Sequence, residues 1–238
     1  MALLGLGVGG VTVVATAPLA FAVRTAGVVL PEGVALSGTV WNGTALMRGH
    51  RASWQSRAWA SVAALAWVSD LRISGPDTAL TGQWRLGPGG VTLAPLTGRV
   101  GWSLLEAVMP GLEIRCATVA EVNLTTVTLA RTQAQAQAQV QVQATGQIQL
   151  AAGTCARVDG TVTGVPLPAL LADIATTVDG VGVNITGLDA PSVPLGALLL
   201  TPDARLRVTV HAAGAAMVPG LPSTGDSQIE LPLALFVQ

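Results

Sequence analysis

This sequence contains no lysine and no tyrosine, and it is poor in charged and aromatic residues. Charged side chains make up 11% of its 238 residues, well below the roughly 25% usual for soluble domains. The 12 arginines and 13 acids give a formal net charge of -1, and no basic run occurs, so the composition excludes nucleic acid as an expected partner. Since only 3% of the residues are aromatic, any core must consist of Ala, Val and Leu.

Cysteine is also scarce, with only Cys116 and Cys155 present. Two cysteines are too few for a disulfide-dense miniprotein, and their spacing is not that of a CxxC metal or redox motif. In an oxidising compartment they would form one disulfide, worth about 4 kcal/mol by loop closure, and in a reducing one they would be two buried thiols. The compartment argued below favours the disulfide.

Recognisable catalytic motifs are missing. There is no GxSxG, no P-loop and no paired-carboxylate segment, and the acids are scattered singly. The two histidines, His50 and His211, are far apart and lack metal-ligand spacing, so we expect neither a metal nor another cofactor. The sequence leaves open a Ser-His-Asp triad assembled in space, but we expect a protein that is not an enzyme.

Residues 1–23 form the longest apolar run and contain no charged residue. As a helix they would span about 35 Å, enough for a hydrocarbon core of about 30 Å. A cleaved signal peptide is the alternative, but the basic n-region of such peptides is missing and the apolar stretch is long. We therefore expect a transmembrane anchor at 1–23, a linker at 24–35, and a water-exposed β-rich domain at 36–238.

Alternation of apolar and polar residues with a period of two dominates this domain. Gln occupies every odd position of 133–143 and small apolar residues occupy the even ones, which predicts a long strand that continues in phase to Leu150. Segments 181–185 and 205–211 alternate similarly, and GPGG at 87–90 predicts a four-residue hairpin loop. These signals predict an elongated, curved antiparallel sheet.

Three short helices are predicted between the strands. The first follows the apolar spacing of Trp59, Val62, Ala63, Ala66 and Trp67, with Ser56 as its cap. The second begins at a capping box formed by Ser103 and Glu106, and the third covers 166–175. Short matches at 36–40, 96–100 and 158–162 indicate a faint repeat of about 60 residues.

The six tryptophans all lie in the first half of the chain, at positions 41, 54, 59, 67, 84 and 102. They would suit a contact patch or a membrane interface. We expect core packing instead, because the chain has few other large side chains.

The stretch LSGTVWNGTA at 36–45 contains Asn42-Gly43, a strong signal for a two-residue hairpin turn. Its residues Gly38, Thr39, Val40, Trp41, Asn42 and Gly43 resemble the signature near the start of the type II secretion system protein N family. ATAPLA at 15–20, ISGPDTALTGQW at 73–84 and LTGRVGWSLLEAVMPGL at 96–112 are also similar to segments of that family. The resemblance covers about residues 15–115.

This resemblance implies a bacterial inner-membrane protein with one membrane span and a periplasmic β-rich domain. Such a protein supports export of folded proteins across the outer membrane, through contacts with other secretion components. The family carries no known catalytic residues to transfer to this chain. A second hypothesis is a lipid-binding groove similar to those of AsmA-like and TamB-like proteins, since the Ala/Val face of 134–144 would suit a groove as well as a packed core.

Overall fold

The computed structural model describes Leu19 and residues 33–109, 111–134, 137–203, 205–217 and 225–232. Within these ranges the chain is mainly β-strand with a few short helices, so the prediction of a mainly β fold with a large antiparallel sheet is confirmed. No helix in the described ranges is long and apolar enough to span a bilayer. The anchor predicted for 1–23 lies outside the described residues, apart from Leu19.

Thirteen strands form one sheet in which every neighbouring pair is antiparallel and the spatial order follows the chain. In that order the strands are β1 (Val34–Gly38), β2 (Asn42–Met47), β3 (His50–Ser56), β4 (Trp67–Ser74), β5 (Ala79–Gly87), β6 (Gly90–Gly101), β8 (Val119–Ala134), β9 (Gln137–Leu150), β12 (Leu170–Thr177), β13 (Gly180–Gly187), β14 (Ala190–Leu200), β15 (Arg205–Val210) and β16 (Ser227–Pro232). The sheet is thus a meander, in which each strand pairs with the strands of the same sheet that come before and after it in the sequence.

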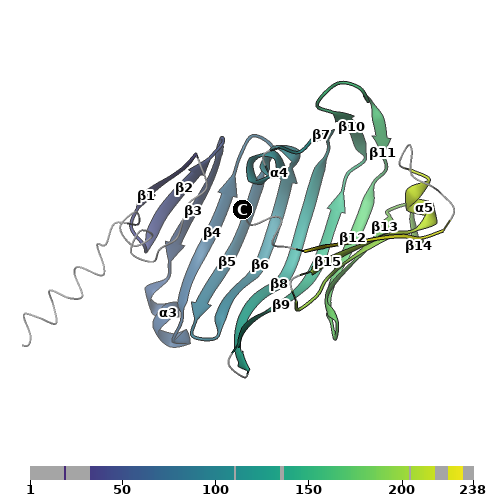
Figure 1. Ribbon diagram of the computed structural model, residues 1–238. Coiled ribbons are helices and arrows are strands. Elements are labelled where there is room, and N and C mark those ends of the chain that lie inside the picture. The colour runs from purple at the N-terminus through teal and green to yellow at the C-terminus, as the bar shows by residue number, and fades with distance from the viewer. Residues whose placement is uncertain are drawn as a thin grey trace, which may run out of the picture.

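A second sheet contains β7 (Ile114–Ala117), β10 (Gly153–Arg157) and β11 (Val165–Leu167). In the sequence, β7 lies between β6 and β8, and β10 and β11 lie between β9 and β12. In space, the small sheet lies beyond the upper end of the large sheet in Figure 1. The described helices are α3 (Ala58–Ala64) at the opposite end, α4 (Trp102–Val108) and α5 (Ala212–Ala215).

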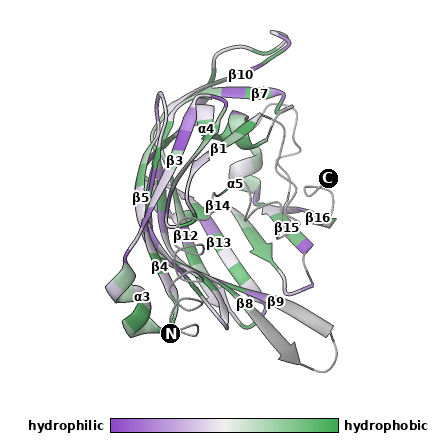
Figure 2. Cartoon of the chain, turned by 90° about the vertical axis from the view of Figure 1, so that its left-hand side faces the viewer, coloured by the Kyte–Doolittle hydropathy of each residue, from purple (hydrophilic) through white to green (hydrophobic). Residues whose placement is uncertain are grey.

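The large sheet is curved across its strands. In Figure 2, β3, β4 and β5 lie on the left, β15 and β16 lie on the right, and α5 lies between them. Figure 1 shows the same bend from the front, where the later strands come forward past the earlier ones. The sheet therefore encloses a trough.

The strand register divides this sheet into two faces of different chemistry. Because successive side chains point to opposite faces, residues that pair across neighbouring strands share a face. One unbroken row contains Trp54, Leu71, Gly82, Leu96, Leu124, Gly146, Ile174, Val183, Leu198, Val208 and Ile229. On the opposite face, the row beside it contains Ser53, Arg72, Thr81, Thr97, Asn123, Gln147, Asp173 and Asn184.

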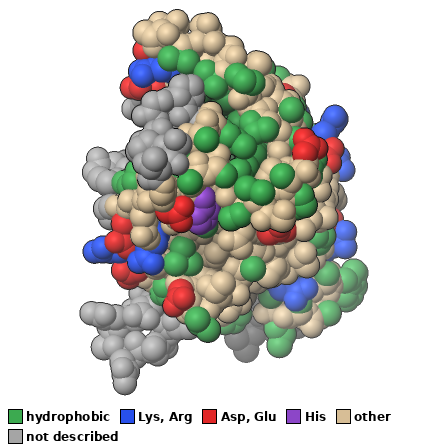
Figure 3. Space-filling view, turned by 90° about the vertical axis from the view of Figure 1, so that its right-hand side faces the viewer, with side chains coloured by type: hydrophobic (Ala, Val, Ile, Leu, Met, Phe, Trp, Pro, Cys, Tyr) green, Lys and Arg blue, Asp and Glu red, His purple; other side chains and the backbone are tan. Residues whose placement is uncertain are grey.

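Exposure identifies the apolar face as the inner one. Along β9, Gln143, Gln147 and Gln149 are exposed, whereas Ala144 is buried and Ile148 is half-buried. The inside of a curved sheet is less accessible to solvent than the outside, so the apolar face lines the trough. The outer face is less polar over β12 and β14, where Leu171 and Leu199 lie on it, and Figure 3 shows hydrophobic side chains on that side.

Several predicted elements differ from the observed ones. The Gln-rich segment 133–143 is not one strand, because β8 ends at Ala134 and β9 begins at Gln137 on the other side of a hairpin. The alternation remains in phase across this hairpin and includes no Gly, Pro or Asn to mark it. The predicted helix at 166–175 is also wrong, since β11 and β12 occupy it. Its apolar residues suit a strand that pairs on both edges.

Turns and caps differ as well. The loop predicted at 87–90 is tighter than expected, because Gly87 pairs with Gly90 and only two residues connect β5 and β6. Ser56 lies in β3 and does not cap α3, whose N-cap is Arg57. The three matches of the proposed repeat occupy different settings, namely the end of β1, the second half of β6 and the connection between β10 and β11.

Candidate functional site: an apolar trough

The described residues cover the inner face of the large sheet only partly. Among the described residues, ten hydrophobic side chains are buried, in a chain that is 50% hydrophobic. Most members of the apolar row, including Leu71, Leu96, Leu124 and Leu198, are half-buried. Within the described part of the chain no second layer seals this apolar surface, and open apolar surfaces are typical of binding sites.

Four of the tryptophans gather at one end of the trough. Trp41 stacks on Trp67 with ring centroids 4.4 Å apart, and Trp67 stacks on Trp84 at 6.4 Å. Trp54 occupies the same face on β3. All four are half-buried, so the expected core packing leaves this cluster partly exposed to solvent.

Beside these rings is a cavity of about 430 Å³, called here the tryptophan pocket, lined by Trp54, Trp67, Trp84, Leu71, Leu86 and Leu19 among others. Its volume lies in the range of ligand pockets, roughly 300–1,000 Å³. Two of the indole N–H groups already have protein acceptors. Trp54 Nε1 donates to the Val40 carbonyl at 2.9 Å, and Trp67 Nε1 donates to the hydroxyls of Ser56 and Ser69. The pocket thus offers ring faces and aliphatic side chains to a ligand.

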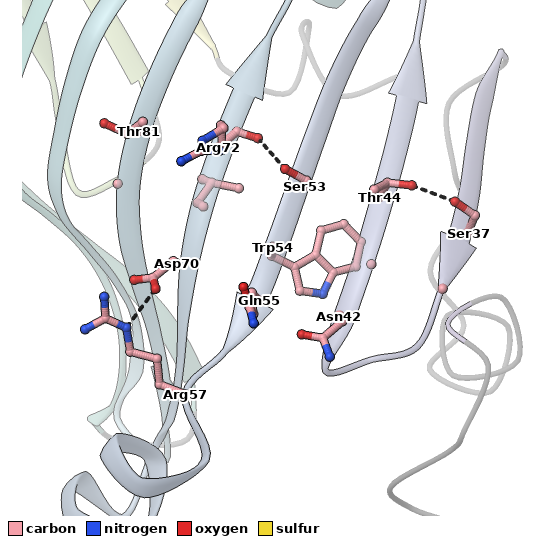
Figure 4. A pocket seen from close by; sticks show the side chains of 14 residues that line it. Ser37, Asn42, Thr44, Ser53, Trp54, Gln55, Arg57, Asp70, Arg72 and Thr81 are labelled. Carbon is pink, nitrogen blue, oxygen red and sulfur yellow. Dashed lines mark hydrogen bonds and ion pairs between the residues drawn. The ribbon is translucent and has the colours of Figure 1, made fainter.

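A second depression lies on the polar outer face, over β1 to β5, with a volume of about 810 Å³. Figure 4 shows its hydroxyl and amide side chains beside an ion pair between Arg57 and Asp70, 2.7 Å apart. Both ion-pair side chains are about half exposed. This arrangement is a solvated surface, and its lining holds a single carboxylate, so it lacks the paired acids of a glycosidase site.

Serine, histidine and aspartate do meet at one place, near the start of α4. The Ser103 hydroxyl donates to the Asp77 carboxylate and lies 3.0 Å from His50 Nε2. In a nucleophilic triad the acid binds the histidine, and the histidine takes the serine proton. Here Asp77 takes that hydrogen bond itself, while the buried Nδ1 of His50 has no partner among the described residues. The cluster is therefore not arranged to activate Ser103.

The same cluster caps α4. The Ser103 N–H donates to the Asp77 carboxylate at 3.2 Å. The Thr78 hydroxyl donates to the same carboxylate and accepts a hydrogen bond from the Gly101 N–H. Burial raises the pKa of the Asp77 carboxyl, but the hydrogen bonds from Ser103 and Thr78 outweigh burial and hold the pKa below its ordinary value of 3.8. The capping box predicted for Ser103 and Glu106 is wrong, because the N-cap is Gly101 and Asp77 reaches the helix from another turn.

The predicted signature residues 38–43 form the corner between β1 and β2, beside the tryptophan cluster. The turn differs from the one predicted: Gly38 pairs with Gly43, and the Thr39 N–H donates to the Asn42 carbonyl at 2.9 Å, so Thr39, Val40 and Trp41 form the connection. Asn42 and Gly43 belong to β2 and pair with β3. Gly38 has a φ of 92°, a left-handed conformation that favours glycine.

Cys116 and Cys155 pair directly across β7 and β10, and the structure joins them in a disulfide. The loop that it closes contains the long β8–β9 hairpin, so the bond ties the small sheet to both ends of that hairpin. Among the described residues no group of His, Cys, Asp and Glu side chains is placed to hold a metal ion.

The sequence suggests a groove only as the second hypothesis, from the Ala/Val face of 134–144. The sequence signal for it is the phase of the alternation, which places apolar residues on one face in strand after strand. Comparisons with protein-family models, with curated proteins and with solved structures find no match to this chain.

Proposed function

We propose that this chain is a non-enzymatic accessory component of a type II secretion system, which acts by binding in the bacterial cell envelope. The observation that carries the binding part of the proposal is the trough. Thirteen strands present one continuous, half-covered apolar face, and the Ser-His-Asp cluster near it is a helix cap. Such a surface suits recognition of an elongated apolar partner.

The resemblance at residues 38–43 supports assignment to the secretion apparatus, and the structure gives these residues local roles. Gly38 adopts a left-handed backbone conformation, and Trp41 stacks on Trp67. Gly43 has no side chain and so leaves room for the ring of Trp54. A segment constrained at several positions makes a useful family signature. The family also implies the mainly β domain that is observed here.

The proposed location is the inner membrane, with the β-rich domain in the periplasm. Disulfides persist in oxidising compartments, and the periplasm is one of them. The Cys116–Cys155 bond therefore supports this location. Partners would be other secretion components, recruited at the trough or at β1 and β16, which among the described strands end the sheet and have one neighbour each.

Deletion of the gene tests the secretion role. The deletion strain should accumulate normally secreted enzymes in its periplasm, and the wild-type gene should restore export. Complementation with Gly43→Val should restore export poorly, whereas Gly89→Ala, at a turn with open space around it, should restore it fully. Normal export by the deletion strain under all growth conditions would contradict the proposal.

The partial cover of the trough favours a second candidate, a lipid-binding groove similar to those of AsmA-like and TamB-like proteins. The tryptophan pocket is apolar and open enough to accept a hydrocarbon chain. Native mass spectrometry of the purified full chain separates the two candidates. Phospholipid that co-purifies with the wild-type chain and is lost from Leu71→Gln supports lipid binding, and its absence from the wild-type chain contradicts it.

A further inference from the structure

Helix α3 leaves large apolar side chains in solvent. Trp59 is 89% exposed, Leu65 is 86% exposed and Val62 is 68% exposed. Residues 58–66 include no charged side chain, and no residue of α3 is buried. The apolar face predicted for this helix therefore does not pack against the sheet.

The helix is nevertheless held firmly in position. The Ser61 hydroxyl donates to the Arg57 carbonyl at 2.8 Å and accepts the Val68 N–H at 2.9 Å, which attaches α3 to the start of β4. Leu65 ends the helix in a left-handed conformation with a φ of 48°. The exposed side chains are thus presented on an ordered turn.

We propose that α3 inserts Trp59, Val62 and Leu65 into the surface of a phospholipid bilayer. Tryptophan is favoured at the membrane interface, and apolar patches on soluble proteins mark membrane or protein contacts. The membrane is favoured over a protein because Leu19, which belongs to the apolar N-terminal sequence, lies at the same end of the sheet. Leu19 of that segment lines the tryptophan pocket together with Trp67, the first residue of β4 after α3.

This arrangement orients the molecule on the bilayer. α3 projects at one end of the large sheet, and β10 lies beyond the other end, as Figures 1 and 2 show. With α3 in the interface, the tryptophan pocket lies next to the lipid, and the small disulfide-bonded sheet lies farthest from it. The proposal requires no charge attraction, because α3 itself is uncharged.

The test uses the full chain reconstituted in phosphatidylcholine vesicles, with a single cysteine labelled by the environment-sensitive fluorophore NBD. Ala63→Cys places the label on exposed α3 and retains Trp59, Val62 and Leu65. Val158→Cys is the matched control, since Val158 is 61% exposed on the connection that follows β10. Because both native cysteines are in the disulfide, labelling requires no reductant.

The fluorescence emission of the label at 63 should be blue-shifted, and iodide should quench it less than it quenches the label at 158. Lipids with a doxyl group on the acyl chain should quench the label at 63 several-fold more strongly than the label at 158. Adding phosphatidylglycerol should change this little. Adding Trp59→Gln and Leu65→Gln should restore access of iodide, and thermal denaturation of these exposed-site variants should match the parent.

Three results would overturn the proposal. Equal quenching by iodide at 63 and 158 would show that α3 stays in water. Shielding from iodide without doxyl quenching would show that a protein, either a second copy or another partner, covers the helix. Doxyl quenching that persists after both glutamine substitutions would show that the N-terminal segment alone brings the label to the bilayer.

Discussion

Gly43 and Trp54 face each other across β2 and β3, and the indole of Trp54 lies where a side chain on residue 43 would be. Gly43 is therefore required for space, and its backbone is that of an ordinary strand. The same indole donates to the Val40 carbonyl and lines the tryptophan pocket. This contact couples the turn at residues 39–41 to the floor of the trough.

Gly43→Ala should destabilise the protein by about 1–3 kcal/mol, because overpacking forces the indole or the strand to move. Chemical denaturation of the purified chain measures this change. Gly89→Ala, where a new Cβ meets no neighbouring atom, should change stability by less than about 0.5 kcal/mol. Gly43→Ala combined with Trp54→Ala should show strong coupling, and additive losses would contradict a direct contact.

The double substitution Cys116→Ser with Cys155→Ser should lower the free energy of unfolding by about 2–4 kcal/mol, because the disulfide closes a long loop. The loss should be concentrated in the small sheet. Hydrogen exchange should therefore accelerate more in β7 and β10 than in β4 and β5. Equal acceleration throughout would show that the small sheet unfolds only with the large one.

The lowered pKa of Asp77 predicts that the folded chain loses stability in acid. Its folded pKa lies below 3.8, so ionised Asp77 stabilises the folded chain fully above that value, and this contribution is lost as pH falls through the lower, folded pKa. Near neutral pH, Asp77→Asn should cost about 1–2 kcal/mol, and the difference from wild type should shrink as the pH falls below 3.8.

Denaturation at a series of pH values checks this prediction. Asp189→Asn, at an exposed turn, serves as the control and should follow the wild-type curve. A difference between Asp77→Asn and wild type that stays constant down to pH 2 would show that the Asp77 cap does not depend on its charge.

The sequence predicts the strands better than their connections. Val181, Val183 and Ile185 share the inner face as expected, because period-two alternation records which face is apolar. The hairpin after Ala134 was missed because its residues continue the alternation, and the helix at 166–175 was wrong because a short apolar run suits either structure. In both cases the deciding factor was pairing with distant strands, which local patterns do not contain.

The candidate site was only partly predictable for a related reason. The alternation in 133–143 predicts an apolar face, but not whether another layer covers it. The stacking of Trp41, Trp67 and Trp84 depends on the register of strands that are separated by turns. Asp77 and Ser103 also meet only because β5 and β6 return the chain to the same end of the sheet.

Binding of a hydrocarbon chain in the tryptophan pocket is measured most directly by quenching of tryptophan fluorescence with 9,10-dibromostearate, using non-brominated stearate as the reference. If the trough holds lipid, as the second candidate proposes, the wild-type chain should show saturable quenching. Leu71→Gln, which places an amide in the pocket, should weaken binding about tenfold, whereas Leu46→Gln on the outer face should leave it unchanged. No saturable quenching, or an equal effect of both substitutions, would contradict a trough that binds apolar chains.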